Sequence, residues 1–408
     1  MNYLSNQMYI MSGKDDLTQF WADSYGLSAK HYKTVYASNI IREHGISFLH
    51  KKIENDVVKY KISLLLIDIS VTQCNPFIIF DLKQKYGLMV VLLAIDDEMK
   101  FDWISSSYGS IADLVITTDY VSVDRYRQSG VNAYFLPLPV HIQEKTTPSK
   151  FIYDVSFVGR VDKGKPIREK YINFLKNEMS VSIFGSSGPS DPQFLSVDKM
   201  YSIFRNSTVN LNFTGITTYV PSENPLFERI RGMKLRPFEI AAAGGMCISE
   251  FSISLAKSFK DGVEIVFFTN EYDMVEKIKY YLEHQDEARK IAISGQDKVM
   301  KKYSNEAIAM QFKSLTKKSQ ACLGVDLYGT PQRVKISRWF AYSLIEYTSV
   351  NIVTLLVKGR FRLFFCDIGY LIRFIKRLSI NIGTIFTFQA IFIGLYRLIK
   401  TILFKVKF

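Results

Sequence analysis

Continuous apolar runs follow one another along the first third of the chain, separated by helix-like segments. A segment with helical spacing, residues 29–44, is followed by apolar runs at 62–69 (ISLLLIDI), 88–95 (LMVVLLAI), 112–117 (ADLVIT) and 134–137. Runs without polar alternation are typical of strands buried on both faces, and such strands form parallel sheets covered by helices. The pattern predicts a Rossmann-like domain over residues 1–145, with no clear strand before the first helix.

The same alternation resumes after a linker. Residues 136–150 are rich in Pro, Thr and Ser, which favours a connecting segment with a boundary near residue 145. Strands are then expected at 153–160, 181–185, 209–214 and 264–269, and helices at 168–177, 198–206, 273–284 and 286–303. This order predicts a second parallel α/β domain over residues 146–325.

The composition suits a chain with more than one core. Of its 408 residues, 48% are hydrophobic and 14% aromatic, and a chain of this length favours two domains. The four cysteines lie far apart, and neither they nor the five histidines show the spacing of a metal site. We therefore expect reduced thiols, no metal and no resident cofactor. The N-terminal residues lack the charged start and apolar core of a signal peptide.

The segment Leu235–Ser249 (LRPFEIAAAGGMCIS) concentrates the candidate chemistry. A proline at a helix start, an alanine run and two glycines predict a loop, a short helix, a tight turn and a buried strand. Lys234 and Arg236 stand at the start of this helix, where amides and cations together suit an anion. On local sequence alone, an ordinary βαβ crossover with a solvated Glu239 fits equally well.

This segment resembles the donor-site motif of GT-B glycosyltransferases, R-x-F-E-x-x-A-x-G-G followed by an apolar strand. It is most similar to the motif of the CgeB-like group within glycosyl transferase group 1. The resemblance covers residues 151–315, where FVGR, V-x-I-x-G, the LNF strand and the motif occur in the family's order. It implies a GT-B fold, in which two Rossmann-like domains face a cleft and the second binds a nucleotide-sugar.

The resemblance also implies the donor-site residues. Glu239 becomes the ligand of the nucleotide ribose, and Arg236 and Lys234 become ligands of the diphosphate. The other implied positions belong to glycine-rich loops and the cations beside them: Gly159, Arg160, Arg168, Gly185, Ser186, Gly244 and Gly245. A turn glycine at Gly159 and a solvated arginine at Arg160 are an equally good interpretation of the sequence.

An inverting transfer also needs a base on the acceptor side. Asp96 and Asp97 follow an apolar run at the carboxyl edge of the first predicted sheet, where ligands of such sheets bind, so they are the candidate catalytic acids. A pair of solvated acids is the alternative. The wider superfamily often has two glutamates separated by seven residues, and Arg231 occupies the first of those positions here, with Glu228 out of register. The resemblance therefore assigns no contact to the donor sugar.

The positive charge of the protein is concentrated at the C-terminus. The whole chain has a net charge of +13, and residues 331–408 hold 13 Lys and Arg against only Glu346 and Asp367. Within 358–378, bulky apolar side chains alternate with cations at helical spacing, which is typical of a helix in an anionic membrane interface. Residues 326–408 are therefore predicted to form a basic, amphipathic helical tail, with residues 333–408 contacting the membrane.

The uncharged stretch 378–396 is just long enough to span a bilayer. Both of its flanks are basic, however, which favours keeping both on the cytoplasmic face, so monotopic attachment is preferred over a span. A nucleic-acid-binding arm is disfavoured because the tail is too apolar, and a buried pair of helices is the remaining structural alternative.

These patterns favour a glycosyltransferase that is peripheral or monotopic on the cytoplasmic side of the cell membrane. It would move a sugar from a nucleotide-diphosphate sugar to a lipid-linked or cell-surface glycan, without metal and without a nucleic-acid partner. The alternatives are a membrane-tethered GT-B-like scaffold without activity, or a nucleotide-sugar epimerase or phosphorylase of the same fold.

Overall fold

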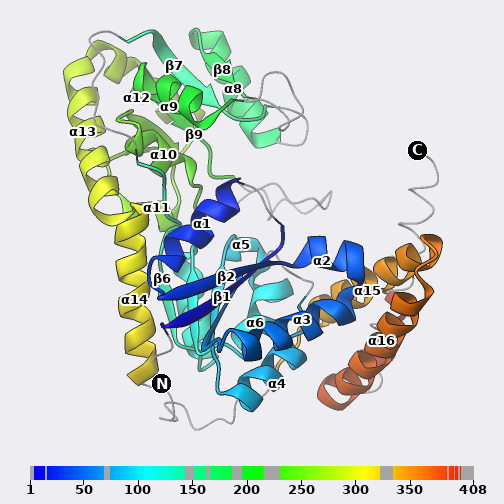
Figure 1. Cartoon of the computed structure of the whole chain (residues 1–408). Helices are drawn as coiled ribbons and strands as arrows, with labels where there is room; N and C mark the ends of the chain where they lie inside the picture. Colours follow the sequence, from blue (N-terminus) through cyan, green and yellow to red (C-terminus); the bar gives the residue numbers. More distant parts are fainter. Residues whose placement is uncertain are drawn as a thin grey trace. The chain divides into compact units, whose positions relative to one another are not determined.

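Parallel strands buried on both faces form the two cores of the chain. The computed structural model describes residues 4–13, 16–68, 74–142, 151–161, 166–185, 195–215, 230–321, 334–383, 386–389, 391–393 and 396. Two compact units emerge. Unit 1 comprises residues 1–118, 122–136 and 309–408, and unit 2 comprises residues 119–121 and 137–308. Figure 1 shows both units, with many of their elements labelled.

Unit 1 contains a six-stranded, wholly parallel sheet with the strand order β2-β1-β3-β4-β5-β6. Its strands are β1 (Asn6–Met11), β2 (His31–Tyr36), β3 (Leu64–Asp68), β4 (Met89–Ala94), β5 (Leu114–Thr117) and β6 (Ala133–Phe135). The last four coincide with the predicted apolar runs. Every residue of β3, β4 and β5 is buried, which confirms that they are covered on both faces.

The N-terminal part of unit 1 differs from the prediction. A strand, β1, precedes the first helix, and the segment predicted as one helix over 29–44 is β2 followed by α2 (Ala37–His44). The reason is that β2 lies at the sheet edge, where its polar residues are exposed. An edge strand needs no continuous apolar run, so its pattern does not distinguish it from a helix.

Helices connect the strands of unit 1. They are α1 (Asp16–Gly26), α2, α3 (Ile46–Lys59), α4 (Pro76–Tyr86), α5 (Asp97–Lys100), the π-helix η1 (Phe101–Ser105), α6 (Ser106–Gly109) and α7 (Tyr120–Gln128). Three long helices from the C-terminal part follow: α14 (Asn305–Ala321), α15 (Arg338–Val357) and α16 (Phe361–Ile382).

The C-terminal segment is helical, as predicted, but its inner face belongs to the core of unit 1. Phe340 and Leu344 of α15 and Phe374 and Leu378 of α16 are buried in one apolar cluster with residues of the sheet and its helices. Figure 1 shows α15 and α16 as two neighbouring helices in orange and red. The alternative of a buried helix pair therefore describes this inner face.

Specific contacts fix α16 to unit 1. The carboxylate of Asp367 is fully buried and accepts the backbone N–H groups of Ile46 and Ser47, both at 2.9 Å, at the start of α3. Two ring contacts accompany this cap: Tyr370 stacks on His50 at 5.4 Å, and Phe374 lies 6.1 Å from Phe77. Helix α16 is thus attached through polar and aromatic contacts, and its position does not depend on apolar burial alone.

The predicted uncharged stretch 378–396 is not one continuous helix. Helix α16 ends at Ile382, and Gly383 follows with a φ of 84°, a left-handed conformation that favours glycine. Among the described residues, one helix, α15, is long and apolar enough to cross a membrane, and half of its most apolar window is buried inside the protein. A core helix of a soluble unit meets the same criteria of length and composition.

Unit 2 contains a five-stranded parallel sheet with the order β11-β10-β9-β7-β8. Its strands are β7 (Tyr153–Val158), β8 (Ser182–Phe184), β9 (Ser207–Asn212), β10 (Cys247–Glu250) and β11 (Val266–Phe268). Its helices are α8 (Pro166–Glu178), α9 (Val197–Arg205), α10 (Arg236–Ala242), α11 (Ile253–Ser258), α12 (Glu271–Glu283) and α13 (Gln285–Lys302). Except for the short helix α11, which was not predicted, these elements follow the predicted order.

The boundaries between the units differ from those expected at residues 145 and 325. The N–H of Val140 donates to the carbonyl of Tyr303 at 3.0 Å, which ties the end of the predicted first domain to unit 2. Helix α14 instead packs on unit 1, where Phe312 meets Tyr25 with ring centroids 5.3 Å apart. The tail and the helix before it are therefore parts of unit 1 and not a separate third domain.

Candidate donor-binding site

The motif segment folds as its sequence predicts. Helix α10 begins at Arg236 with Pro237 in its first turn, and Phe238 is fully buried, with its ring centroid 4.8 Å from that of Phe259 and 5.0 Å from that of Tyr303. Gly244 then adopts a left-handed φ of 81°, and β10 follows. Because α10 has only seven residues, its dipole is small, and binding of an anion there depends on side chains.

Glu239 and Arg236 form an ion pair on the first turn of α10. The guanidinium Nη1 lies 2.7 Å from Oε2 of the carboxylate, and both side chains are partly accessible, with exposed fractions of 28% for Arg236 and 15% for Glu239. Arg236 also packs on α9, where it donates to the sulfur of Met200 and lies 5.5 Å from the ring centroid of Phe204. Glu239 is thus oriented by its neighbour, at the junction of α9 and α10.

The surroundings of this pair are partly apolar. Tyr201 of α9 has a raised pKa, mainly because it is buried and secondly because the charge of Glu239 is near. Lys234, the third predicted residue of this group, is half-buried just before α10. The structure therefore brings Glu239 and Arg236 together on one helical turn, with Lys234 close in sequence. Their roles in binding a nucleotide stay predictions.

Gly244 and Gly245 have evident structural reasons to be glycines. A Cβ atom on Gly245 would lie 2.6 Å from the carbonyl oxygen of Phe204 and 2.8 Å from Nδ2 of Asn210, which no side chain tolerates. Gly244 needs its left-handed φ to end α10. Both positions allow α10 and β10 to approach their neighbours closely. Whether either glycine also contacts a donor stays a prediction.

A second cluster lies at the carboxyl ends of β7 and β8. The N–H of Gly159 donates to the carbonyl of Phe184 at 2.8 Å, and a Cβ on Gly185 would lie 3.3 Å from the nitrogen of Gly159. Arg168, in the first turn of α8, donates from Nη1 to the carbonyl of Arg160 at 2.8 Å. Gly159, Arg160, Arg168 and Gly185 thus form one group, as the resemblance implies, and Ser186 lies outside the described residues.

This cluster combines close backbone approach with two arginine side chains. Gly159 and Gly185 have φ values of 155° and 95°, so the backbone approaches closely without side chains in the way. The guanidinium of Arg168 lies over the ring of Phe157, 5.3 Å from its centroid, and the side chain of Arg160 is exposed. Arginine suits phosphate oxygens because its planar fork can donate two hydrogen bonds.

The two candidate catalytic acids lie in different environments. Asp97 is fully buried and accepts a hydrogen bond from Oγ1 of Thr117 at 2.9 Å. Burial first, and then the charge of Asp97, raise the pKa of Tyr126 beside it. Asp96 retains 39% of its side-chain exposure, lies 3.5 Å from Nζ of Lys100, and has a left-handed φ of 58°. In the arrangement described, only Asp96 is accessible to an acceptor.

Glu250 was not among the predicted residues. It ends β10, is 2% exposed, and its Oε1 lies 2.5 Å from Nε of Arg231. A single acid at the end of an apolar strand gives no periodic signal, so sequence reasoning had no means of separating it from a solvated residue. The described residues contain no group of three or more His, Cys, Asp or Glu that could hold a metal ion.

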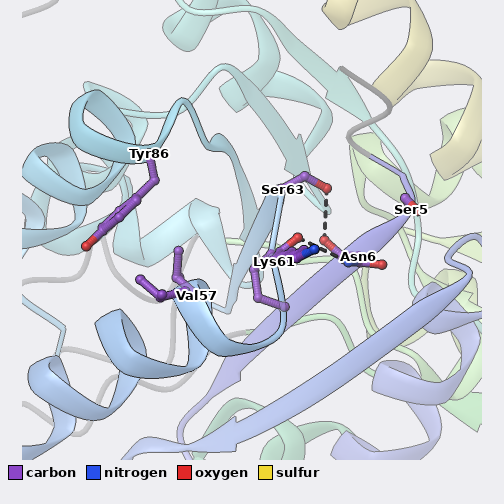
Figure 2. Close-up of a pocket in the computed structure, with 8 residues that line it drawn as sticks. Ser5, Asn6, Val57, Lys61, Ser63 and Tyr86 are labelled. Atoms are coloured by element: carbon purple, nitrogen blue, oxygen red, sulfur yellow. Dashed lines mark hydrogen bonds between the residues drawn. The ribbon is translucent and has the colours of Figure 1, made fainter.

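A cavity of about 530 Å³ lies in unit 1, at the amino ends of β1 and β3. Figure 2 shows Asn6, Lys61 and Ser63 on one side of it, with Val57 and Tyr86 on another. Asn6 donates to the carbonyl of Lys61 at 3.1 Å, and Ser63 donates to the carbonyl of Asn6 at 3.1 Å, so these polar groups bond to the chain itself. No predicted site residue lines this cavity.

Solved structures share this arrangement of two parallel α/β units. The chain is similar to HepE of Anabaena in complex with UDP and glucose, with a TM-score of 0.56 and 12% identity over 77% of this chain and 100% of HepE. It is similar to sucrose-phosphate synthase of Thermosynechococcus elongatus, with a TM-score of 0.57 and 12% identity over 78% of this chain and 100% of the synthase. These likenesses establish the GT-B fold.

A protein family also matches part of the chain. Residues 168–314 match the family described as glycosyl transferase-like, a segment that includes the motif and runs from α8 into α14. No curated protein matches the chain. The chain therefore has the GT-B fold, and about a third of it, residues 168–314, is similar to glycosyl transferases.

Proposed function

We propose that the protein transfers a sugar from a nucleotide-diphosphate sugar to a lipid-linked or cell-surface glycan, without a metal ion, on the cytoplasmic side of the cell membrane. The observation that carries the donor half of this proposal is the grouping of Gly159, Arg160, Arg168 and Gly185 at one end of the unit 2 sheet. HepE, which has the same fold, binds UDP and UDP-glucose.

The chemistry of such a transfer places its main demand on the leaving group. Breaking the bond between the sugar and the diphosphate builds negative charge on a phosphate oxygen, and fixed cations stabilise that charge without a metal. Among the described residues, Arg160 and Arg168 are cations of the group that contains Gly159 and Gly185. In this proposal they hold the diphosphate, while Glu239 accepts hydrogen bonds from the ribose hydroxyls.

The ion pair between Glu239 and Arg236 is compatible with that role. Arg236 bonds to Oε2, and a carboxylate has about four lone-pair sites on its two oxygens, so ribose hydroxyls can bond to the same group. Arg236 then keeps the carboxylate oriented. On the acceptor side, Asp96 is our choice of base because it is accessible at the carboxyl end of β4 and Asp97 is not.

Binding of nucleoside diphosphates to a matched pair of variants tests the donor site. Wild-type protein is screened by thermal shift with UDP, GDP, ADP and CDP, and the tightest binder is measured by calorimetry with Glu239→Gln and with Glu276→Gln. Glu276 is an exposed acid of α12 in the same unit. We expect Glu239→Gln to weaken binding of the nucleotide about tenfold, since hydrogen bonds to charged groups are among the stronger ones, and Glu276→Gln to leave it unchanged.

Equal binding by both variants would remove Glu239 from the site. If none of the four nucleotides binds the wild type, the transferase proposal fails, and a membrane-tethered scaffold becomes the better account. Conversion of a nucleotide-sugar into its epimer, with no acceptor consumed, would instead identify an epimerase.

The membrane half of the proposal rests on the outward face of α16. Its inner face is buried in unit 1, yet four apolar side chains on the other side are more than half exposed: Phe361, Phe365, Ile372 and Ile380. The exposed cations Arg362, Arg373 and Lys376 lie between them in sequence. Apolar groups beside cations suit the interface of an anionic bilayer, where the rings enter the acyl boundary and the cations meet headgroups.

Flotation with vesicles tests this surface without disturbing the fold. Because α15 and α16 are part of the core, point variants are preferable to a deletion. Phe365→Glu with Ile372→Glu changes two exposed residues of α16, and Ile293→Glu changes an exposed residue of α13 as a control. We expect wild type and control to float with phosphatidylglycerol vesicles and the double variant to stay in solution. Equal flotation of all three would refute attachment through α16.

A further inference from the structure

A buried carboxylate in unit 2 anchors an arginine whose role is not explained by the motif. Glu250 is 2% exposed at the carboxyl end of β10. Its Oε2 accepts three hydrogen bonds from the segment after β9: the N–H of Thr214 at 2.9 Å, the hydroxyl of Thr214 at 3.1 Å and the N–H of Gly215 at 3.0 Å. This carboxylate is held rigidly by two neighbouring strands.

The second oxygen of the same carboxylate faces Arg231. The distance from Oε1 to Nε of Arg231 is 2.5 Å, and the arginine backbone pairs with that of Gly215 in an antiparallel bridge. Arg231 retains 28% of its side-chain exposure, whereas Glu250 is buried. The ion pair is thus asymmetric, with a buried acid and a partly exposed guanidinium, whose Nη1 also donates to the carbonyl of Ile230 at 3.5 Å. A buried acid that fixes one edge of a guanidinium orients its other donors.

Arg231 lies beside the cluster at the ends of β7 and β8. A Cβ on Gly215 would lie 3.8 Å from Nη1 of Arg231 and 4.0 Å from Cδ1 of Ile167. Ile167 directly precedes Arg168, whose Nη1 is 3.6 Å from the position of a Cβ on Gly159. The first turn of α8 therefore connects Arg231 with Arg168 and with the glycine loop.

Arg236 and Arg231 are held in place in different ways. Arg236 pairs with an acid of its own helical turn and packs against Met200 and Phe204, so its charge is shared with Glu239. Arg231 is held from a different strand by an acid whose other oxygen is already used by the backbone. Both guanidinium groups pair with a carboxylate and both arginine side chains are 28% exposed, but only Arg231 is held by an acid that the backbone fixes in place.

We infer that Arg231 binds the diphosphate of the nucleotide-sugar donor, and that Glu250 is the positioning residue that holds its guanidinium in place. This inference rests on the proposed function, because it assumes that the anion recognised in unit 2 is a nucleoside diphosphate. It assigns the phosphate contact to Arg231 together with Arg160 and Arg168, and leaves Arg236 to orient Glu239.

The test compares a nucleoside with its diphosphate, so that the phosphate contribution is isolated. Dissociation constants are measured by calorimetry for UDP and uridine, or for the tightest nucleoside diphosphate of the thermal-shift panel and its own nucleoside. The variants are Arg231→Gln, Arg231→Lys and Glu250→Gln, with Arg289→Gln as the control, since Arg289 lies on α13 over the ring of Phe151. Each variant is first checked for a native unfolding transition.

We expect Arg231→Gln to weaken the diphosphate about 10- to 100-fold and to leave the nucleoside unchanged, because charge-assisted hydrogen bonds to phosphate are lost. Arg231→Lys keeps the charge without the planar fork, so it should recover part of the loss. Glu250→Gln should weaken the diphosphate severalfold, also without affecting the nucleoside. The affinity of the wild type should fall with added salt more steeply than that of Arg231→Gln.

Three results would overturn the inference. Arg231→Gln could bind the diphosphate as tightly as the wild type, could lose nucleoside and diphosphate equally, or could keep the full salt dependence. If Arg231→Gln does not fold, the double variant Arg231→Gln with Glu250→Gln replaces it, because it leaves no unpaired buried charge. Failure of the wild type to bind any nucleoside diphosphate is a separate outcome, and it refutes the proposed function itself.

Discussion

At the scale of single residues, the partner of a charged group decides how easily that group can serve a ligand. The pair of Arg236 and Glu239 is an i,i+3 pair on a helix surface, and such pairs stabilise a helix by only about 0.2–0.5 kcal/mol. It can open for a ribose at little cost. The pair of Arg231 and Glu250 is anchored by a buried acid, and separating it would leave an uncompensated charge.

Gly245 gives a prediction about packing near the motif. Substitution by alanine places a Cβ within 2.8 Å of both the Phe204 carbonyl and the amide nitrogen of Asn210. That nitrogen donates to the Phe204 and Met246 carbonyls, so the substitution disturbs a buried network. We expect Gly245→Ala to lower the free energy of unfolding by about 2 kcal/mol, as measured by urea titration.

Gly13→Ala is the matched control for this substitution. A Cβ on Gly13 meets nothing within 4 Å, so its effect on the free energy of unfolding should be within about 0.5 kcal/mol. Equal changes in the free energy of unfolding for both substitutions would show that the close approach at Gly245 does not contribute to stability.

Sequence patterns recover residues of the site only where a motif fixes their spacing. Glu239 and Arg236 stand in one motif and meet on one helical turn. Gly159 and Gly185 are 26 positions apart in sequence and were assigned through the family resemblance; each lies just after a strand of the same parallel sheet. Glu250 and the burial of Asp97 depend on contacts with Arg231 and Thr117, distant in sequence, which no local pattern encodes.

At the scale of elements, strands were predicted well where both of their faces are covered. The runs at β3 and β4 consist almost entirely of buried apolar residues, so their pattern is continuous. Strand β2 was missed because its first residues are exposed at the sheet edge. The inner face of α16 was missed for a different reason, since a helix that is apolar on two sides fits a membrane or a core equally well.

The junction of α3 and α16 contains a histidine that must stay neutral. Nε2 of His50 accepts the N–H of Asn75 at 3.0 Å, so Nδ1 carries the proton and donates to the carbonyl of Ile46 at 2.9 Å. A second proton on Nε2 would face that N–H group. Burial lowers the pKa of His50 to about 4, and its bond to the Ile46 carbonyl only partly opposes this shift.

This shift predicts how stability depends on pH. Between the ordinary pKa of about 6.5 and the folded value of about 4, the unfolded chain binds the proton and the folded chain does not. The stability that neutral His50 contributes is therefore fully present above pH 6.5 and is lost as the pH falls towards 4. From pH 7.5 to pH 5 we expect the contribution of His50 to fall by about 2 kcal/mol, measured as the free energy of unfolding in urea.

His50→Gln should flatten this part of the pH profile, because the titrating group is removed. His44→Gln is the control, since His44 is about half exposed and should leave the profile as it is. The same slope in wild type and in His50→Gln would contradict the assignment of this pH dependence to the junction.

At the scale of the whole molecule, the two units differ in the segments of the chain that form them. Apart from residues 119–121, unit 2 is one continuous stretch, 137–308, whereas unit 1 joins residues 1–118 and 122–136 to residues 309–408. The apolar cluster of unit 1 contains Met8 near one end of the chain and Leu378 near the other. The basic C-terminal part is therefore required for the core of unit 1, whatever else it contacts.

Deleting residues 331–408 tests this dependence. The deletion removes Phe340, Leu344 and Phe374 from the core, and removing one such side chain typically costs about 2–5 kcal/mol against a total stability of about 5–15 kcal/mol. We expect unit 1 to unfold and unit 2 to persist, so that limited proteolysis leaves a protected fragment close to residues 137–308. A soluble truncated protein that resists proteolysis over residues 4–136 would disprove this view.

The discontinuity of unit 1 also sets an order of events during synthesis. A ribosome releases the first 136 residues long before α15 and α16 exist, so the nascent sheet of unit 1 waits without the helices that complete its core. Unit 2, emerging next as a nearly unbroken stretch, can reach its native state first. Unit 1, although it is translated earlier, matures last, and in the meantime its uncovered apolar strands are exposed to chaperones or to misassociation.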